Sequence, residues 1–572
     1  MKTNWKILQP DIKTVRSVSA ILKCGQIIAT IFANRNLTLQ DNIKLFVNPS
    51  LSNLGSPFKI KDMDNAVKRI VSAVQNSEKI LIFGDYDVDG ITATAIVYDF
   101  LKKAGADIIF YIPHRIEEGY SIKKKSIDYA KTKDANLIIT VDCGSNGFEA
   151  VEEAKKVGID IIITDHHKTP EILPNAYAVV NPKRKDCSSG LEYLAGVGVA
   201  YYLIICIRKH FRDIGFWNKS KPEPNLKELC DLVALGTVAD IVPLINENRI
   251  FVKTGLDNIN KRARLGIKKL IKISGINSGK IDAEDISFKL APRLNAAGRM
   301  DSANCAVRLL TARQDEEADN IAASLNRLNI ERQKTEKKAL DKVFAYIKGD
   351  SSILKRKALV LVNENWHQGI IGIMASRIAK KFKRPAVLIA LNENFGKGSA
   401  RSIPGIDIYE AFKECESYLE DFGGHPMAAG IQIKKDNING FKEHFEKTIT
   451  DFLNDKKSGA DIIIDRKITF ADINSDLITA LDPLKPFGTA NPEPLFIAEN
   501  VTVQKFWVIG KTHKKMLLKD ETCRNGKLIS AIQFNVDIED MDKKRFDYII
   551  FNLSFNKWKG SNSIQLQIKD FL

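Results

Sequence analysis

Three short apolar runs in the first third of the chain each end in an acidic residue. The runs and the aspartates that follow them are residues 80–83 with Asp85, residues 137–141 with Asp142, and residues 161–164 with Asp165. Apolar runs of this length suit strands of a parallel sheet that is buried on both faces. Amphipathic stretches at 91–106 and 148–157 lie between them, so the pattern predicts repeated β-α-β units.

Ligands of a parallel sheet bind beyond the carboxyl ends of its strands, so the polar residues at these ends should share one crevice. Those residues are Asp85, Asp87, Asp89, Asp142, Asp165, His166 and His167. Two carboxylates about 4 Å apart repel each other by about 4 kcal/mol at an effective dielectric constant of about 20. A divalent cation removes this repulsion, and the mixture of oxygen and imidazole ligands suits Mn²⁺ or Mg²⁺.

Each motif also has a simpler explanation. Residues 85–90 (DYDVDG) look like the start of a calcium-binding EF-hand loop, but Ile96 occupies the position of the required bidentate acid. Asp142 alone could cap a helix. His166 and His167 could be structural histidines that a neighbouring acid holds in place.

Asp240 lies in the apolar segment 236–243 (GTVADIVP), where an unpaired carboxylate would be costly. A metal ion would neutralise it, and a buried salt bridge is the alternative.

Length and charge restrict the class of protein. A chain of 572 residues should hold three or four domains, and its net charge of +16 indicates a polyanionic partner, unless it only reflects a lysine-rich proteome. The eight cysteines are scattered singly, which predicts reduced thiols. The longest apolar stretch near the N-terminus, residues 27–33, is too short for a membrane span and shows no signal-peptide pattern. We therefore expect a cytoplasmic protein.

The pattern along the chain predicts a multidomain α/β protein. The expected parts are an N-terminal segment (1–50), a catalytic α/β domain (51–275), a linker with a long helix (276–352), a smaller α/β substrate-binding domain (353–455) and a C-terminal β-barrel (456–572). Residues 299–348 contain neither Gly nor Pro, and residues 316–348 predict one long helix.

Three further segments suit phosphate. Residues 398–402 (GSARS) form a predicted loop that offers a guanidinium, hydroxyls and backbone amides, and residues 423–430 (GGHPMAAG) form a predicted glycine-rich loop with one histidine. Residues 291–299 (APRLNAAGR) add two arginines in a predicted short loop. Ordinary turn chemistry is the alternative for the first two.

The C-terminal stretch 501–520 carries five lysines and one acid around Phe506 and Trp507. Interleaved positive and aromatic residues on a barrel suit single-stranded nucleic acid. A solvated strand with core aromatics is the alternative.

Together, DYDVDG, VDCG, TDHH and GTVADIVP resemble the DHH phosphoesterase superfamily, and GSARS and GGHPMAAG resemble its DHHA1-type second domain. APRLNAAGR, the long helix, PFGTANPEP (486–494) and the barrel narrow the resemblance to the RecJ family of single-strand-specific 5′→3′ exonucleases. The resemblance implies a parallel-sheet DHH domain, a long linking helix, a smaller α/β DHHA1 domain and an OB-like barrel.

The resemblance also implies two metal ions, Mn²⁺ or Mg²⁺. Their ligands would be Asp85, Asp87, Asp89, Asp142, His166 and Asp240. Asp142 would bridge the metals, the catalytic His167 would lie near the scissile phosphate, and Asp165 would orient a histidine. The substrate-binding residues would be Arg115 and Tyr120 at the terminal nucleotide, Arg293, Asn295 and Arg299 along the strand, and Ser399, Arg401 and His425 at phosphates.

The implied reaction is two-metal hydrolysis of single-stranded DNA to 5′-mononucleotides in DNA recombination and repair. Implied partners are a RecQ-like helicase and a single-strand-binding protein, with the enzyme a monomer. Two rival functions stay open: another DHH activity, on short RNA, cyclic dinucleotides or pyrophosphate, and an inactive replication scaffold.

Overall fold

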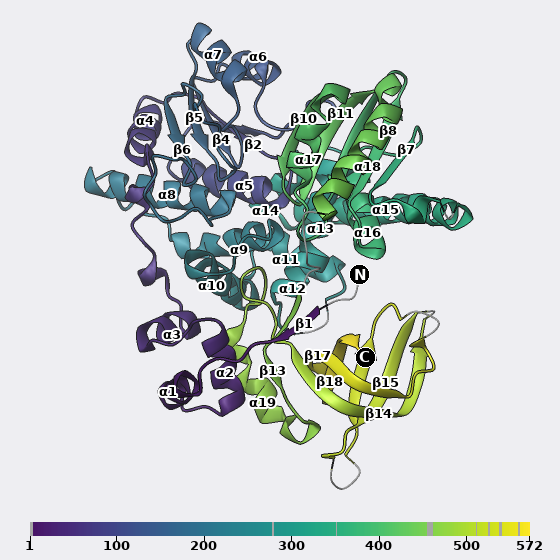
Figure 1. Cartoon of the computed structure of the whole chain (residues 1–572). Coiled ribbons are helices and arrows are strands. Elements are labelled where there is room, and N and C mark those ends of the chain that lie inside the picture. The colour runs from purple at the N-terminus through teal and green to yellow at the C-terminus, as the bar shows by residue number, and fades with distance from the viewer. Residues whose placement is uncertain are drawn as a thin grey trace.

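The computed structural model describes residues 4–276, 279–350, 352–454, 461–510, 512–523, 527–536, 540–558 and 561–572. Figure 1 shows two α/β lobes at the top, a long helix that projects beside the second lobe, and a β-barrel with the N-terminal helices below. This arrangement confirms the multidomain α/β fold that the sequence predicts.

The first lobe is built on a five-stranded parallel sheet. In spatial order its strands are β3 (Ile108–Tyr111), β2 (Ile80–Gly84), β4 (Leu137–Val141), β5 (Asp160–Thr164) and β6 (Ala178–Val180). Side chains alternate along a strand, so Ile80 and Ile82 face one helical layer while Leu81 and Phe83 face the other. The first layer contains α4 (Met63–Gln75), α5 (Val88–Lys103), α8 (Gly196–Asp213) and α9 (Cys230–Ala239), and the second contains α6 (Lys124–Thr132) and α7 (Phe148–Lys156).

A helical segment connects the two α/β lobes. Its elements are α11 (Leu265–Ile273), α12 (Ala283–Asp285), the π-helical turn η4 (Ile286–Leu290), α13 (Ala291–Met300), α14 (Asn304–Thr311) and α15 (Asp315–Gly349). α15 confirms the predicted long helix, and acids at its N-terminus suit the helix dipole. The loop prediction for residues 291–299 was wrong: they form α13, because Pro292 lies in the first turn, where no backbone N–H is needed.

The second lobe is built on a mixed sheet. Its strands, in spatial order, are β10 (Leu419–His425), β11 (Ala428–Lys434), β9 (Phe395–Arg401), β8 (Ala386–Asn392) and β7 (Leu359–Asn363), and its helices are α16 (Ile371–Phe382), α17 (Ile408–Glu414) and α18 (Ile438–Asn454). The segments 398–402 and 423–430 lie mainly in β9 and the β10–β11 hairpin, so their assignment to loops was also wrong. Because side chains alternate along β9, Ala400 packs in the core between Ser399 and Arg401.

The C-terminal part is a closed five-stranded barrel, as predicted. Its strands are β14 (Phe496–Ile509), β15 (His513–Lys519), β16 (Ile529–Gln533), β18 (Ser561–Phe571) and β17 (Arg545–Trp558), and β17 pairs with β14 to close it. β13 (Arg466–Lys467) and α19 (Ser475–Ala480) precede the barrel.

The N-terminal residues pack on this part of the chain. Helices α1 (Ile12–Leu22), α2 (Gln26–Asn34) and α3 (Gln40–Val47) share a hydrophobic core with the barrel, and β1 (Asn4–Ile7) pairs in parallel with β12 (Asp461–Ile464). In the described part of the chain, no single helix is long and apolar enough to cross a membrane; α1 and α2 reach that length only as a pair bent by 112°.

One buried arginine connects the first lobe to the lower half of the molecule. Arg249, in α10 (Asn246–Arg262), donates hydrogen bonds of 2.8–3.4 Å to five backbone carbonyl oxygens, those of Phe46, Pro483, Leu484, Lys485 and Pro486. Its guanidinium lies 3.6 Å from the centre of the Phe46 ring. Burial, followed by the charge of Arg35, lowers the pKa of Arg249 to about 9, so the side chain stays charged near neutral pH.

Candidate active site

The predicted metal ligands lie together at one edge of the parallel sheet. The register pairs Gly84 with Val141 and Val141 with Thr164, so the residues after these strand ends form a row. They are Asp85 after β2, Asp142 after β4, and Asp165, His166 and His167 after β5. Asp87 caps α5 by accepting hydrogen bonds from the backbone N–H groups of the next turn, and Asp240 ends α9.

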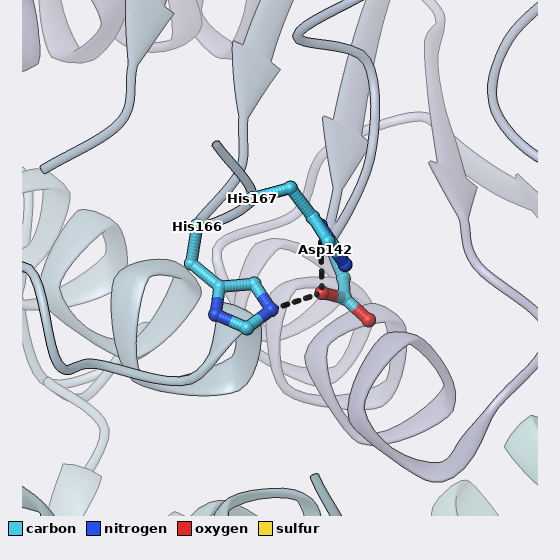
Figure 2. Close-up of side chains that lie close together, drawn as sticks. All are labelled: Asp142, His166 and His167. Carbon is cyan, nitrogen blue, oxygen red and sulfur yellow. Dashed lines mark ion pairs between the residues drawn. The ribbon is translucent and has the colours of Figure 1, made fainter. Parts of the chain in front are cut away.

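His166 lies among three of the carboxylates. Its Nε2 is 3.1 Å from Asp142 Oδ1, 3.6 Å from Asp240 Oδ2 and 3.7 Å from Asp89 Oδ2. Its Nδ1 donates a hydrogen bond to the carbonyl oxygen of Leu194 at 3.0 Å, so Nε2 carries the lone pair that a metal needs. Figure 2 shows His166 to the left of the Asp142 carboxylate and His167 above it, with both histidines facing the same oxygen, Asp142 Oδ1.

The candidate ligands form overlapping groups whose ligand atoms lie within 4.8 Å of one another. The groups are Asp85, Asp87 and Asp142; Asp89, His166 and Asp240; and Asp142, His166 and His167. Asp142 belongs to the first group and also contacts His166 of the second. The structure therefore brings all six predicted ligands together, with Asp142 between the two halves.

Several ligand atoms have no hydrogen-bond partner. Within the described residues, Asp85 Oδ1, Asp142 Oδ1 and His166 Nε2 are buried and accept no hydrogen bond. Burial, followed by repulsion from neighbouring carboxylates, raises the pKa of Asp85, Asp142 and Asp240 well above the usual range and that of Asp89 to about 7. Burial lowers the pKa of His166 to about 3, so its ring is neutral. Divalent cations would satisfy these atoms, so the residues fit the predicted metals.

Asp165 holds the histidines in place. Its carboxylate accepts hydrogen bonds from the backbone N–H groups of Ser145, His166 and His167 and, at 2.8 Å, from His167 Nδ1. Burial opposes the charge on His167, but the hydrogen bond that it donates to Asp165 prevails and raises the pKa of His167 to about 9. The Tyr120 hydroxyl lies 3.1 Å from the same Nδ1.

Two glycines that the sequence analysis did not identify, Gly196 in α8 and Gly236 in α9, allow these helices to pack closely against the acids. The backbone N–H groups of Gly196 and Val197, at the start of α8, donate hydrogen bonds of 2.7 and 2.8 Å to Asp89. A Cβ on Gly196 would lie 2.4 Å from Asp142 Oδ1, and one on Gly236 would lie 2.8 Å from Asp89 Oδ1. The run of Ala, Gly and Val at 195–199 was the available signal.

Three arginines, Arg115, Arg299 and Arg401, lie close enough to affect one another. Burial, followed by the charges of neighbouring arginines, lowers the pKa of Arg299 to about 9, and burial with Arg115 lowers the pKa of Arg401. Arg299 donates to the carbonyl oxygen of Gly369 at 3.1 Å, and Arg401 donates to Ser399 Oγ at 3.3 Å. Within the described residues, none of the three has a carboxylate within 4.0 Å, so the cluster suits an anion such as phosphate.

The other substrate-binding candidates are placed differently. The ring centre of His425, on the β10–β11 hairpin, lies 6.0 Å from that of His167, so the second lobe reaches the metal ligands. Asn295 Oδ1 accepts a hydrogen bond from the backbone at the start of α5. Arg293 donates to Asn326 Oδ1 at 2.9 Å and to a carbonyl oxygen of η4 at 2.6 Å, so the protein already uses two of its donors.

The basic aromatic stretch 501–520 lies on β14 and β15. Trp507 is 40% exposed, and Lys505 Nζ lies 5.0 Å from the centre of its ring. Phe506 packs against the barrel core, and the buried Lys514 donates to two backbone carbonyl oxygens. Lys511 lies outside the described residues. The exposed face of this stretch is therefore the one with Trp507 and Lys505.

Three family models match separate parts of the chain. The DHH family N-terminal domain matches residues 79–237, the DHHA1 domain matches residues 355–451, and the RecJ OB domain matches residues 464–570. The single-stranded-DNA-specific exonuclease RecJ of Bacillus subtilis is 35% identical over all of this chain and 71% of its own length. The same enzyme of Salmonella typhimurium is 36% identical over 90% of each protein.

Solved structures of RecJ have the same fold as this chain. RecJ from Thermus thermophilus in complex with Mn²⁺ matches the whole of this chain and 79% of its own, with a TM-score of 0.83 at 28% identity. Its complex with Mg²⁺ matches 99% of this chain with a TM-score of 0.77. On this sequence identity and coverage, the chain belongs to the RecJ family.

Proposed function

We propose that the protein is a single-stranded-DNA-specific 5′→3′ exonuclease, which releases 5′-mononucleotides by two-metal phosphodiester hydrolysis and acts in DNA recombination and repair. The observation that carries the proposal is the pair of ligand groups that meet at Asp142, in the same molecule as an arginine cluster that has no carboxylate partner among the described residues. The names of the Bacillus and Salmonella relatives support the substrate, and the Mn²⁺ and Mg²⁺ complexes of the Thermus relative support the metals.

The metals would be held by the six ligands already described: Asp85, Asp87, Asp89, Asp142, His166 and Asp240. When bound, divalent cations supply an activated water and stabilise the charge that develops on the phosphate. The chain contributes by fixing the ligands. The Leu194 carbonyl sets the tautomer of His166, and the start of α8 holds Asp89.

The substrate contacts in this proposal are those that the family resemblance implies. Ser399, Arg401 and His425 bind phosphate, with Arg401 at the 5′ end. Tyr120 and Arg115 contact the terminal nucleotide. The remaining candidates, Arg293, Asn295 and Arg299, line the path of the strand. Arg299 is the best supported of the three, because it belongs to the cluster of three arginines. His167, which Asp165 keeps in place, lies beside the scissile phosphate.

The proposed domain limits are 51–275, 276–352, 353–455 and 456–572, with residues 1–50 as a segment packed on the barrel. The barrel gives the strand a second attachment through Trp507. We place the protein in the cytoplasm as a monomer that works with a RecQ-like helicase and a single-strand-binding protein.

A product assay tests this function. A single-stranded DNA and a blunt duplex of the same sequence are incubated with Mn²⁺, with Mg²⁺ or with EDTA, and the products are separated by chromatography. We expect 5′-mononucleotides from the single strand only, and only with metal. Equal digestion of the duplex, or release of oligonucleotides, would contradict the proposal.

A further inference from the structure

A basic groove lies outside the catalytic cluster, between α15 and the second lobe. It has a volume of about 1000 Å³, and none of the metal-ligand candidates lines it. One wall is β7, the edge strand of its sheet, and the other is α15, which extends past β7 in Figure 1. Four lysines line it: Lys334, Lys338 and Lys342 from α15 and Lys442 from α18.

The charge of the groove is of one sign. No Asp or Glu lines it, and in the part of the chain that the structure describes none of its four lysines has a carboxylate within 4.0 Å. The three lysines of α15 recur every fourth residue, so they form a row spaced about 6 Å apart along the helix axis. Burial, followed by the charge of Arg356, lowers the pKa of Lys442. A polyanion would neutralise this row of cations.

Aromatic side chains accompany the lysines. Tyr346 is one turn beyond Lys342 and is 61% exposed, and the half-buried Trp366 lines the groove beside His367. A row of cations with aromatic surfaces matches single-stranded nucleic acid, which binds through its phosphates and stacks its bases. An acidic polypeptide would use the charges but has no need for the aromatic rings.

The groove adjoins the candidate active site. His367 and Ile370 line the groove, while Gly369 between them accepts the hydrogen bond of Arg299. Gly372, two residues after Ile370, lies against the second lobe's phosphate-binding candidates. A Cβ on Gly372 would lie 2.9 Å from Ser399 Oγ and 3.3 Å from an Arg401 nitrogen. One loop therefore separates the groove from the arginine cluster.

We propose that this groove is a further binding site for single-stranded nucleic acid, distinct from the catalytic cleft and from the barrel, in which the lysines of α15 contact phosphates and Tyr346 and Trp366 stack against bases. The inference rests on the proposed function only for the identity of the strand as DNA. The site holds a part of a long strand that lies outside the catalytic cleft.

The test compares two double variants of the full-length protein. Lys338→Gln with Lys342→Gln removes two groove charges, and Lys337→Gln with Lys348→Gln removes two exposed charges of the same helix outside the groove. Binding of a long fluorescent single strand is followed by anisotropy in EDTA at several salt concentrations. Each lost phosphate contact lowers the salt slope by about 0.7, so the groove variant should lose about 1.4 in slope and about tenfold in affinity at physiological salt. The control variant should bind like the wild type.

Two further measurements separate the outcomes. Cleavage of a dinucleotide, which is too short for the groove, should be the same in both variants. Cross-linking of bromouracil-containing DNA should mark Tyr346 or Trp366. Unchanged affinity of the groove variant for the long strand would overturn the groove site. It would also be overturned if the groove variant lost affinity for polyglutamate while it bound the long strand like the wild type. Failure of the wild-type protein to cleave any DNA would instead overturn the proposed function.

Discussion

Replacing Asp142 with asparagine should stabilise the metal-free protein. The same substitution should remove most of the stabilisation that Mn²⁺ gives to the wild type. Asp142 has a φ of 63°, a left-handed conformation that asparagine tolerates better than most residues. The new amide can donate to His166 Nε2, which lies 3.1 Å from the present carboxylate and accepts no hydrogen bond from the described residues. The substitution therefore removes charge from the cluster without disturbing the backbone.

The magnitude follows from the crowding of the carboxylates. A pair of charges about 4 Å apart repels by about 4 kcal/mol at a dielectric constant of about 20. Burial, followed by this repulsion, raises the pKa of Asp142, so proton uptake relieves part of the repulsion in the metal-free protein. In EDTA, we expect Asp142→Asn to raise the free energy of unfolding by about 1–2 kcal/mol. With Mn²⁺ at a hundred times its dissociation constant, the free energy of unfolding of the wild type should rise by about 2.7 kcal/mol and that of the variant by much less. The wild type should then be the more stable of the two proteins.

Calorimetry of both proteins in EDTA and in increasing Mn²⁺ measures this reversal, and cleavage of single-stranded DNA by the variant should be lost. A variant that is less stable than the wild type in EDTA and gains as much from Mn²⁺ would refute the reasoning.

Three further predictions concern packing and pH. Gly196→Ala places a Cβ 2.4 Å from Asp142 Oδ1, so metal-dependent cleavage should fall by about 100-fold or more while circular dichroism stays unchanged; normal activity would show that the ligands can move freely. Arg249→Met leaves three of the five carbonyl oxygens without the donor that holds them, since Asn491 still serves the other two, and chemical denaturation should show a loss of about 3 kcal/mol. Burial raises the pKa of Glu493 to about 7, so folding favours its protonated form and this group destabilises the protein as pH rises from about 4.5 through 7. Glu493→Gln should therefore add at most about 3 kcal/mol at pH 8 and at most about 1 kcal/mol at pH 5, as thermal unfolding at the two pH values can check.

The metal cluster could be predicted because its residues follow strand ends. Each apolar run marks a buried strand, and parallel register then places Asp85, Asp142 and His166 at one edge without further information. The long helix was equally clear, because an uninterrupted stretch of helix-forming residues has few other structures available.

Other features leave no local pattern. The five carbonyl oxygens around Arg249 come from segments about 200 residues away on either side, so only the tertiary structure reveals that contact. Glycine misled the assignment of residues 398–402. In β9 a Cβ on Gly398 would lie 2.5 Å from the Ile431 side chain, so glycine there allows close packing rather than a turn.

The metal centre and the arginine cluster together should make an exonuclease that begins at a 5′ end. A single strand that carries one label at each end, incubated with Mn²⁺ or with EDTA, tests this directly. We expect the 5′ label to leave at once as a mononucleotide and the 3′ label to be released last, and we expect EDTA to prevent both. Early release of the 3′ label, internal cutting, or survival of the strand with Mn²⁺ would contradict this expectation.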